Sequence, residues 1–316
     1  MYCLTPSGDL LRFQLHGRTL HYELRLSGFE VEEILSFQVH LSPPQDIHLC
    51  LLDSGHSLTY YRFQRSRWQK LQTWAGVSPA YQSLLREGHE MHLCLRLEGK
   101  NRHYILTGEG PQDLEVPWDR PQWDPYRFFP LSEKELMLIH REIKEPSVNF
   151  FAQCFSLPDR RWQPAQFLAS LPAGGRRLSS WRWRDWLYFA YFLTEGQSQA
   201  LHLLGLNLRQ GSRQEQRFSG FSLQAAAPVP ALCREEPVLL VGEAGALVCL
   251  RSADGGRNWP TRLEVPCPWR LELAPVLNHR QEITPYVALE GAGGASFSQP
   301  AVLKADELLS LSSPRS

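Results

Sequence analysis

Short apolar runs separated by polar turns follow one another along almost the whole chain. In one pair, the run at 47–52 is followed by Asp, Ser and Gly at 53–55 and then by a second run at 58–63. Runs of this length around such a turn are typical of two antiparallel strands joined as a β-hairpin. Helical periodicity is almost absent, and only 79–86 and 305–311 are expected to form short helices. The pattern therefore predicts an all-β protein.

The hairpins recur at a nearly constant spacing. They begin at Ile47, Met91, Leu136, Leu187, Val238 and Ile283, which lie 44, 45, 51, 51 and 45 residues apart. The string Ile-His-Leu-Cys-Leu at 47–51 and the string Met-His-Leu-Cys-Leu at 91–95 are nearly identical. A repeat of this length with several strands per unit is what a β-propeller blade requires.

A tryptophan follows the start of four units by 21, 27, 26 and 21 residues: Trp68, Trp118, Trp162 and Trp259. A β-sandwich would leave this spacing unexplained. A single blade has two apolar faces that only neighbouring blades can cover. Together with an N-terminal hairpin at 10–26, the repeats predict a β-propeller of about seven (six to seven) four-stranded blades. We expect a single domain over 1–311 and a disordered tail at 312–316.

One segment, at 252–259, carries a recognisable motif. Its sequence Ser-Ala-Asp-Gly-Gly-Arg-Asn-Trp resembles the Asp-box of BNR/sialidase-type β-propellers, with Asn258 in place of the usual Thr, and the resemblance covers about one blade. Asp254 can accept backbone N–H groups, Gly256 can adopt a positive φ, and Trp259 can pack over the hairpin. A cation at Asp254 is the alternative, although one carboxylate supplies few ligands for calcium. The expected structural motif comprises Ser252, Asp254, Gly256 and Trp259.

Charge and cysteine content exclude several classes of function. The 33 basic and 33 acidic residues give a net charge of zero, so nucleic acid is an unlikely partner. The seven cysteines form no Cys-x-x-Cys pair, and no apolar run has the length of a signal peptide or a membrane helix. We expect a cytoplasmic protein without membrane contact.

No nucleotide-binding or hydrolase motif occurs, and the Arg-Ile-Pro segment of sialidases is also missing. The sequence therefore predicts no catalytic residue, no cofactor and no metal. One metal site stays open as an alternative to buried repeat positions, because His and Cys alternate on one strand face in two neighbouring repeats. Its ligands would be His48, Cys50, His92 and Cys94.

Two aromatic segments are the candidates for recognition. The first, at 118–127, contains two prolines and is expected to be a loop between blades, where ligand-binding residues are common. The second, at 181–186, alternates Trp with Arg, which suits stacking on a ligand but equally suits a strand with its tryptophans facing inward. The candidate binding residues are Trp118, Trp123, Tyr126, Arg127, Trp181 and Trp183.

The sequence thus favours a non-catalytic β-propeller that serves as an interaction scaffold or a ligand-binding module. Its partner would be a protein or a glycan-like ligand held through the blade loops. The alternative function is a carbohydrate-active, sialidase-like glycoside hydrolase on the same fold, which would require carboxylates and arginines to converge on one site.

Overall fold

The computed structural model describes residues 2–4, 10–16, 19–26, 34–42, 46–64, 67–85, 90–107, 110–114, 116, 123–233, 236–243, 246–252, 254, 256–266, 270–277, 283–290 and 302–304. All regular secondary structure within these ranges is β-strand. Contacts divide the chain into two compact units, residues 1, 13–22 and 174–316 on one side and residues 2–12 and 23–173 on the other.

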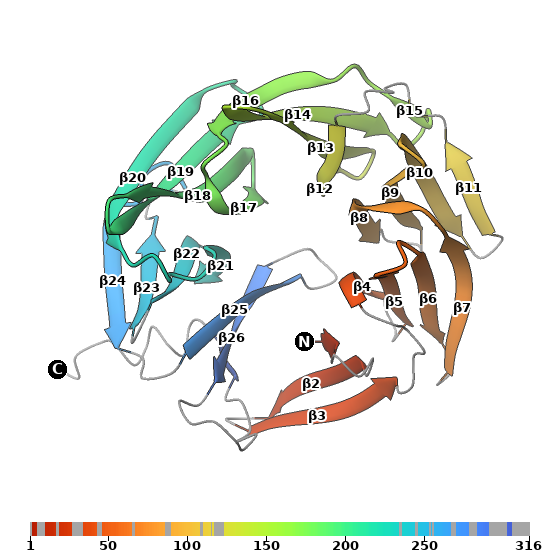
Figure 1. Ribbon diagram of the computed structural model, residues 1–316, viewed down its shortest axis with the longest axis horizontal. Coiled ribbons are helices and arrows are strands. Elements are labelled where there is room, and N and C mark those ends of the chain that lie inside the picture. The colour runs from red at the N-terminus through yellow and green to blue at the C-terminus, as the bar shows by residue number, and fades with distance from the viewer. Residues whose placement is uncertain are drawn as a thin grey trace. The chain divides into compact units, whose positions relative to one another are not determined.

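The strands form seven antiparallel sheets, each built from one continuous stretch of chain (Figure 1). Sheet 1 contains β1 (Tyr2–Leu4), β2 (Leu10–His16) and β3 (Thr19–Leu26), and sheet 2 contains β4 (Ile34–Ser42), β5 (Asp46–Asp53), β6 (Leu58–Gln64) and β7 (Arg67–Trp74). Sheet 3 contains β8 (Val77–Leu85), β9 (Met91–Leu97), β10 (Lys100–Thr107) and β11 (Gly110–Leu114). Sheet 4 contains β12 (Trp123–Ser132), β13 (Glu135–Lys144), β14 (Ser147–Ser156), β15 (Arg161–Trp162) and β16 (Gln166–Pro172).

The remaining three sheets follow in the same manner. Sheet 5 contains β17 (Arg176–Trp183), β18 (Trp186–Glu195), β19 (Ser198–Asn207) and β20 (Arg213–Phe221). Sheet 6 contains β21 (Val229–Cys233), β22 (Glu236–Glu243), β23 (Ala246–Arg251) and β24 (Thr261–Pro266), and sheet 7 contains β25 (Arg270–Leu277), β26 (Ile283–Glu290) and β27 (Val302–Lys304). No sheet in the described ranges combines strands from the two ends of the chain.

The predicted hairpins are confirmed. The pairs β2–β3, β5–β6, β9–β10, β13–β14, β18–β19 and β22–β23 coincide with the apolar runs of the sequence. Central strands are buried on both faces, so they read as unbroken apolar runs; in β18 the first seven residues are all buried. The outermost strand β20 instead alternates between exposed and partly buried positions over most of its length. An outer strand packs one face only, which explains the alternation.

Apolar side chains fill the space between successive sheets within each unit. Sheets 2 and 3 share a core that includes Leu52, Leu58, Tyr81, Met91 and Leu93. Sheets 3 and 4 share one that includes Cys94, Phe128, Leu138 and Phe155. Sheets 5 and 6 share one that includes Tyr188, Phe192, Leu239, Val248 and Trp259. Each sheet thus covers an apolar face of the next, as the repeat pattern predicts.

The helix predicted at 79–86 is wrong, because Pro79 lies in strand β8. The strand lies at the edge of sheet 3 and pairs only with β9, and its register shifts between Val77 and Tyr81. A proline is tolerated at an edge strand or a bulge, since no partner needs its missing N–H. The helix predicted at 305–311 and the tail at 312–316 lie outside the described residues.

Candidate ligand-binding surface at the start of β12

The recognition loop predicted at 118–127 is a strand from Trp123 onward. Pro125 lies opposite His140 in β12, the edge strand of sheet 4, where a missing N–H leaves no sheet partner unsatisfied. The register shifts between Pro125 and Arg127, so Tyr126 has no opposing residue. Trp118 lies outside the described residues. The loop prediction is therefore wrong for 123–127, and the bulge in the strand takes the place of the loop.

Five side chains form a polar surface that we call the β12 surface: Arg96, Asp124, Tyr126, Arg127 and Arg141. Asp124 lies between two guanidinium groups, with Oδ1 at 3.5 Å from Nη1 of Arg96 and Oδ2 at 3.6 Å from Nη2 of Arg141. The guanidinium carbon of Arg141 lies 5.9 Å from the centre of the Tyr126 ring, within range of a cation–π interaction. Strand β9 of sheet 3 and strands β12 and β13 of sheet 4 thus contribute to one surface.

The β12 surface carries three guanidinium groups and one carboxylate. Arg127 takes part in none of the ion pairs formed among the described residues. Partial burial lowers the pKa of the Arg127 guanidinium below its ordinary value. Nε of Arg141 is buried and has no hydrogen-bond partner within the described part of the chain. Positive charge and donor capacity on this surface are therefore only partly satisfied by the protein itself.

An aromatic stack made by Trp123, Phe151 and Phe167 lies on the other face of the same sheet, because Trp123 is opposite Glu142 and Phe151 is opposite His140, whereas Asp124 is opposite Arg141. The Trp123 and Phe151 rings are 4.4 Å apart and nearly parallel, and the Phe151 and Phe167 rings meet edge to face at 5.7 Å. Trp123 is 3% exposed, whereas Phe167 is 61% exposed. Nδ2 of Asn101 also donates to the Trp123 carbonyl at 3.3 Å. Trp123 therefore anchors the stack in the core, and Phe167 is its exposed end.

The second candidate segment belongs to the core between sheets 5 and 6. Trp181 is 3% exposed and its ring stacks on Tyr188 at 5.0 Å. Trp183 is partly buried, and the guanidinium carbon of Arg184 lies 5.4 Å from the centre of its ring. Trp181 thus faces inward and is out of reach of a ligand, as expected for a strand with its tryptophans in the core.

The turn at 252–259 is held by hydrogen bonds among its own residues. Ser252 Oγ donates to Asp254 Oδ1 at 2.9 Å and accepts from the Gly256 N–H at 2.7 Å. Asp254 also accepts from the Asn258 backbone at 2.7 Å and from its side-chain amide at 2.6 Å. Burial opposes ionisation of Asp254, but these hydrogen bonds outweigh it and hold the pKa of the carboxyl below its ordinary value. The carboxylate is thus already committed to the turn.

Side chains of sheet 5 also form hydrogen bonds with the turn at 252–259, which follows strand β23 of sheet 6. The Tyr188 hydroxyl and the Trp259 indole N–H both donate to the Gly256 carbonyl, at 2.9 and 3.0 Å. Gln216 of β20 accepts from the Trp259 N–H at 3.1 Å and donates to the Arg257 carbonyl at 3.2 Å. Sequence reasoning missed Tyr188 and Gln216, which lie 68 and 41 residues from their partners in the turn. The motif therefore joins two sheets in addition to shaping its own hairpin.

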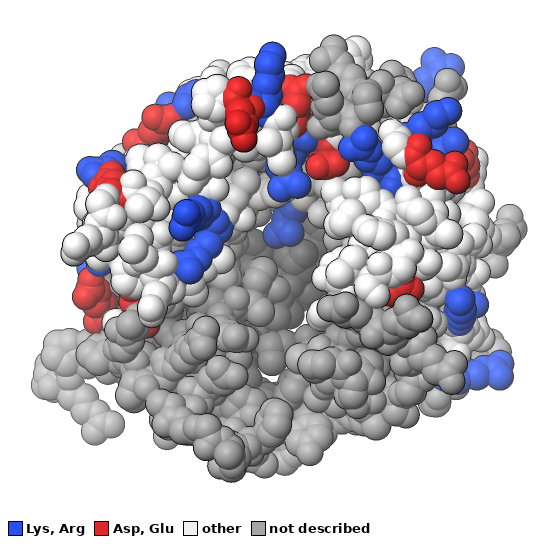
Figure 2. Space-filling view, in the orientation of Figure 1, with Lys and Arg blue, Asp and Glu red and all other residues white. Residues whose placement is uncertain are grey.

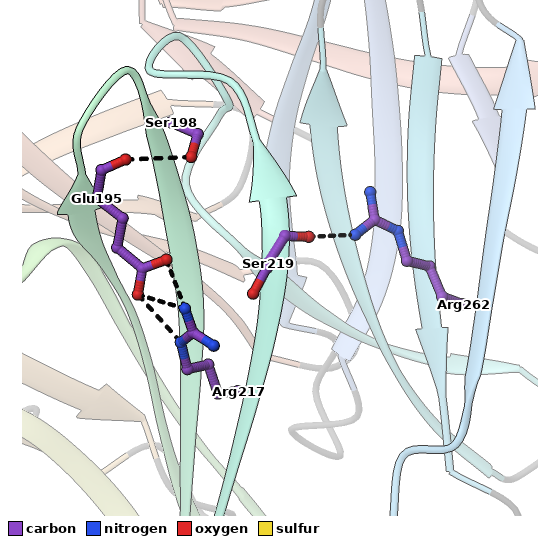
Figure 3. Close-up of polar contacts among 5 residues, drawn as sticks. All are labelled: Glu195, Ser198, Arg217, Ser219 and Arg262. Atoms are coloured by element: carbon purple, nitrogen blue, oxygen red, sulfur yellow. Dashed lines mark hydrogen bonds and ion pairs between the residues drawn. The ribbon is translucent and has the colours of Figure 1, made fainter.

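The outer strands of sheets 5 and 6 are joined by polar contacts as well (Figure 3). Arg217 of β20 donates to both carboxylate oxygens of Glu195 at 2.6 Å. Arg262 of β24 donates to the Ser219 carbonyl of β20 at 2.7 Å, and the Ser198 hydroxyl donates to the Glu195 carbonyl at 3.3 Å. These charges are satisfied within the protein, so the group acts as a link between strands and leaves no open binding site.

Figure 2 shows basic and acidic side chains interspersed over the described residues of one face, in keeping with a net charge of zero. The part of the chain that the structure describes contains no helix with the length and apolarity needed to span a membrane.

The four residues of the alternative metal site do not converge. Cys50 packs between sheets 2 and 3, whereas Cys94 packs between sheets 3 and 4. His48 Nδ1 lies 2.6 Å from the Tyr60 hydroxyl, and His92 Nδ1 lies 3.0 Å from His103 Nε2. Within the described ranges, no group of three or more His, Cys, Asp or Glu side chains is placed to hold a metal ion.

No protein-family model matches the chain, and no curated protein matches it in sequence. Among solved structures, the chain is similar to a protein from Lactobacillus plantarum, with 14% identity, a TM-score of 0.53, and coverage of 94% of this chain and 93% of that one. It is also similar to the dihydro-heme d1 dehydrogenase NirN in complex with DHE, with 10% identity, a TM-score of 0.50, and coverage of 97% and 61%. The WD40 domain of SCAP from fission yeast is 10% identical, with a TM-score of 0.45 and coverage of 92% and 82%.

At this level of identity the likenesses bear on the fold alone. Seven consecutive antiparallel sheets, with apolar layers between neighbours, and the similarity to the Lactobacillus plantarum protein over nearly the whole chain define the class: the chain is a β-propeller. The predicted fold class is confirmed.

Proposed function

We propose that the chain is a non-catalytic β-propeller that acts as an interaction scaffold or ligand-binding module, with a protein or glycan-like ligand bound at the β12 surface. The observation that carries the proposal is the composition of this surface, which holds more guanidinium groups than carboxylates and an aromatic ring, that of Tyr126, within cation–π range of Arg141. Exposed aromatic and arginine side chains are the commonest anchors of binding interfaces.

Ion pairs between several described carboxylates and arginines support a non-catalytic role. Asp124 contacts two arginines, and Glu195, Glu236 and Glu264 each contact one. Glycoside hydrolysis needs two carboxyl groups that face each other across a sugar bond, one of them protonated. The carboxylates of these four residues are occupied by arginines, which disfavours the sialidase-like alternative at these positions.

The turn at 252–259 supports a finer classification. We place the chain among Asp-box (BNR/sialidase-type) β-propellers on the hydrogen bonds that Ser252, Asp254, Gly256 and Trp259 make. We further propose a single propeller domain over 1–311 and a cytoplasmic location. Cys50, Cys94 and Cys154 form no disulfide among the described residues, which supports a reducing compartment.

Tyr126→Ser tests the proposal, because the Tyr126 ring belongs to the β12 surface and Tyr126 has no opposing residue in the sheet. Leu223→Ser is the control, since it also replaces a large side chain by serine, at a position that is 47% exposed, but lies in residues 174–316. The immobilised chain is offered a cell extract with quantitative mass spectrometry as the readout, and in parallel a glycan array. We expect at least one protein or glycan to bind the wild type and Leu223→Ser and to bind Tyr126→Ser at least fivefold less.

Equal retention of every bound protein and glycan by Tyr126→Ser and the wild type would contradict the proposal. Hydrolysis of a glycan by the wild-type chain would contradict its non-catalytic part and revive the enzyme alternative. Thermal unfolding of each variant shows whether both are folded before the comparison is made.

A further inference from the structure

Arg127 is the least compensated charge of the β12 surface. It lies opposite Ile139, which is buried at 0% exposure, so the guanidinium side of β12 adjoins an apolar part of sheet 4. The nearest carboxylate in sequence, Asp124, is already shared by Arg96 and Arg141. A partly buried cation without an acidic partner is costly, and proteins normally avoid it by pairing the charge.

Arg141 supplies a second, independent sign of an unfilled site. Its Nε is buried and lacks a hydrogen-bond partner among the described residues, although its terminal nitrogen is near Asp124. In the register of β12 and β13, Arg127 lies opposite Ile139. Ile139 and Arg141 are two residues apart along β13 and therefore share a face of the sheet. Arg127 and Arg141 are thus on the same face, at neighbouring positions. Glu142 is opposite Trp123 on the other side and accepts from Asn149 at 3.4 Å, so it does not neutralise this pair.

From these two observations we infer that Arg127 and Arg141 bind an anionic group of the ligand, either a phosphate or a carboxylate. This inference rests on the proposed function, because it names the chemistry that the β12 surface recognises. A guanidinium group presents paired N–H donors that match the oxygens of either anion. The Tyr126 ring, which lies beside the Arg141 guanidinium group, would then contact the uncharged part of the same ligand.

Binding of inorganic phosphate and of citrate, each measured against sodium chloride of equal ionic strength, tests the inference. We expect one of the two anions to raise the Tm of the wild type by about 2–4 °C at about ten times its Kd. The anion that does so identifies the source of the charge. In Arg127→Gln the affinity for that anion should fall about tenfold or more, because a charge-assisted hydrogen-bond pair is lost.

Arg161→Gln is the matched control, because Arg161 is an exposed arginine of the same sheet on strand β15, and it should keep the wild-type response. If Arg127→Gln does not fold, Arg127→Lys decides the matter, since it keeps the charge but loses the paired donors. An unchanged anion response in Arg127→Gln, or in Arg127→Lys where that variant is used, would overturn the inference. So would a wild type that responds to neither anion.

The two proposals fail in different ways. If neither anion shifts the wild type while Tyr126→Ser still loses its ligand, only the anionic character of the ligand is wrong. If Tyr126→Ser retains every ligand as well, the β12 surface is not the binding site.

Discussion

At the scale of single residues, Gly256 is constrained both in its backbone conformation and in the space around its Cα. This residue has a φ of 97°, which side-chain-bearing residues rarely adopt, and its carbonyl accepts two hydrogen bonds. A Cβ at position 256 would also collide with the Tyr188 hydroxyl. The sequence predicted the positive φ from the turn chemistry, but it gave no sign of Tyr188, because that side chain comes from another sheet.

We expect Gly256→Ala to lower the free energy of unfolding by about 2–5 kcal/mol, from backbone strain together with the collision. Gly211→Ala separates the two causes, since Gly211 has a φ of 68° but open space around its Cβ position. It should cost about 1–2 kcal/mol. Urea unfolding measures both variants, and an equal loss in the two would show that Tyr188 does not constrain the turn.

Contacts between side chains on different strands were the hardest feature to predict from the sequence. Phe167 sits in a strand whose sequence, Gln-Phe-Leu-Ala-Ser-Leu-Pro at 166–172, does not reveal which face is covered. Trp123 was predicted to be a contact residue and is instead buried, because its stacking partner Phe151 is supplied by β14. The aromatic segment with its prolines at 118–127 therefore contains part of the surface that we propose for binding, but Trp123 itself packs into the core.

At the scale of elements, buried central strands could be predicted from the sequence more easily than edge strands. Central strands such as β13, β18 and β22 are covered on both faces and were visible as apolar runs. The edge strands β8 and β12 were missed, because Pro79 and Pro125 are signals that usually end a strand. The same prolines are harmless at an edge, which sequence alone does not identify.

The difference between central and outer strands predicts hydrogen-exchange protection. β18 is bonded on both sides and largely buried, whereas β20 has one neighbour and an exposed face. We expect amides of β20 to exchange roughly tenfold or more faster than those of β18, because local opening of an outer strand exposes less apolar surface. Mass spectrometry of peptides from the two strands measures this, and equal protection would contradict the assigned strand order.

At the scale of the whole molecule, buried histidines set the response to acid. His92 and His103 are both 0% exposed and form one hydrogen bond among the rings of Phe128 and Phe155. Burial, and then the neighbouring His92, hold the pKa of His103 well below its ordinary value. Burial likewise lowers the pKa of His140 to about 3.

Because these folded-state pKa values are lowered, the unfolded chain binds protons more readily than the folded one. The stability is present above about pH 6.5 and is lost as pH falls below it. Between pH 7.5 and 5.5 each such histidine should remove about 1.4 kcal/mol from the free energy of unfolding. Urea unfolding of the wild type and of His140→Gln at the two values measures the loss, which should be smaller by that amount in the variant. A wild type equally stable at both values would refute the argument.

The whole-molecule account joins a β-propeller fold to one binding surface. Comparison of ligand capture by Tyr126→Ser and Leu223→Ser tests it most directly, because only Tyr126 belongs to the β12 surface. The account predicts that a ligand held by the wild type and by Leu223→Ser is released by Tyr126→Ser alone. Full retention of every ligand by Tyr126→Ser would contradict it.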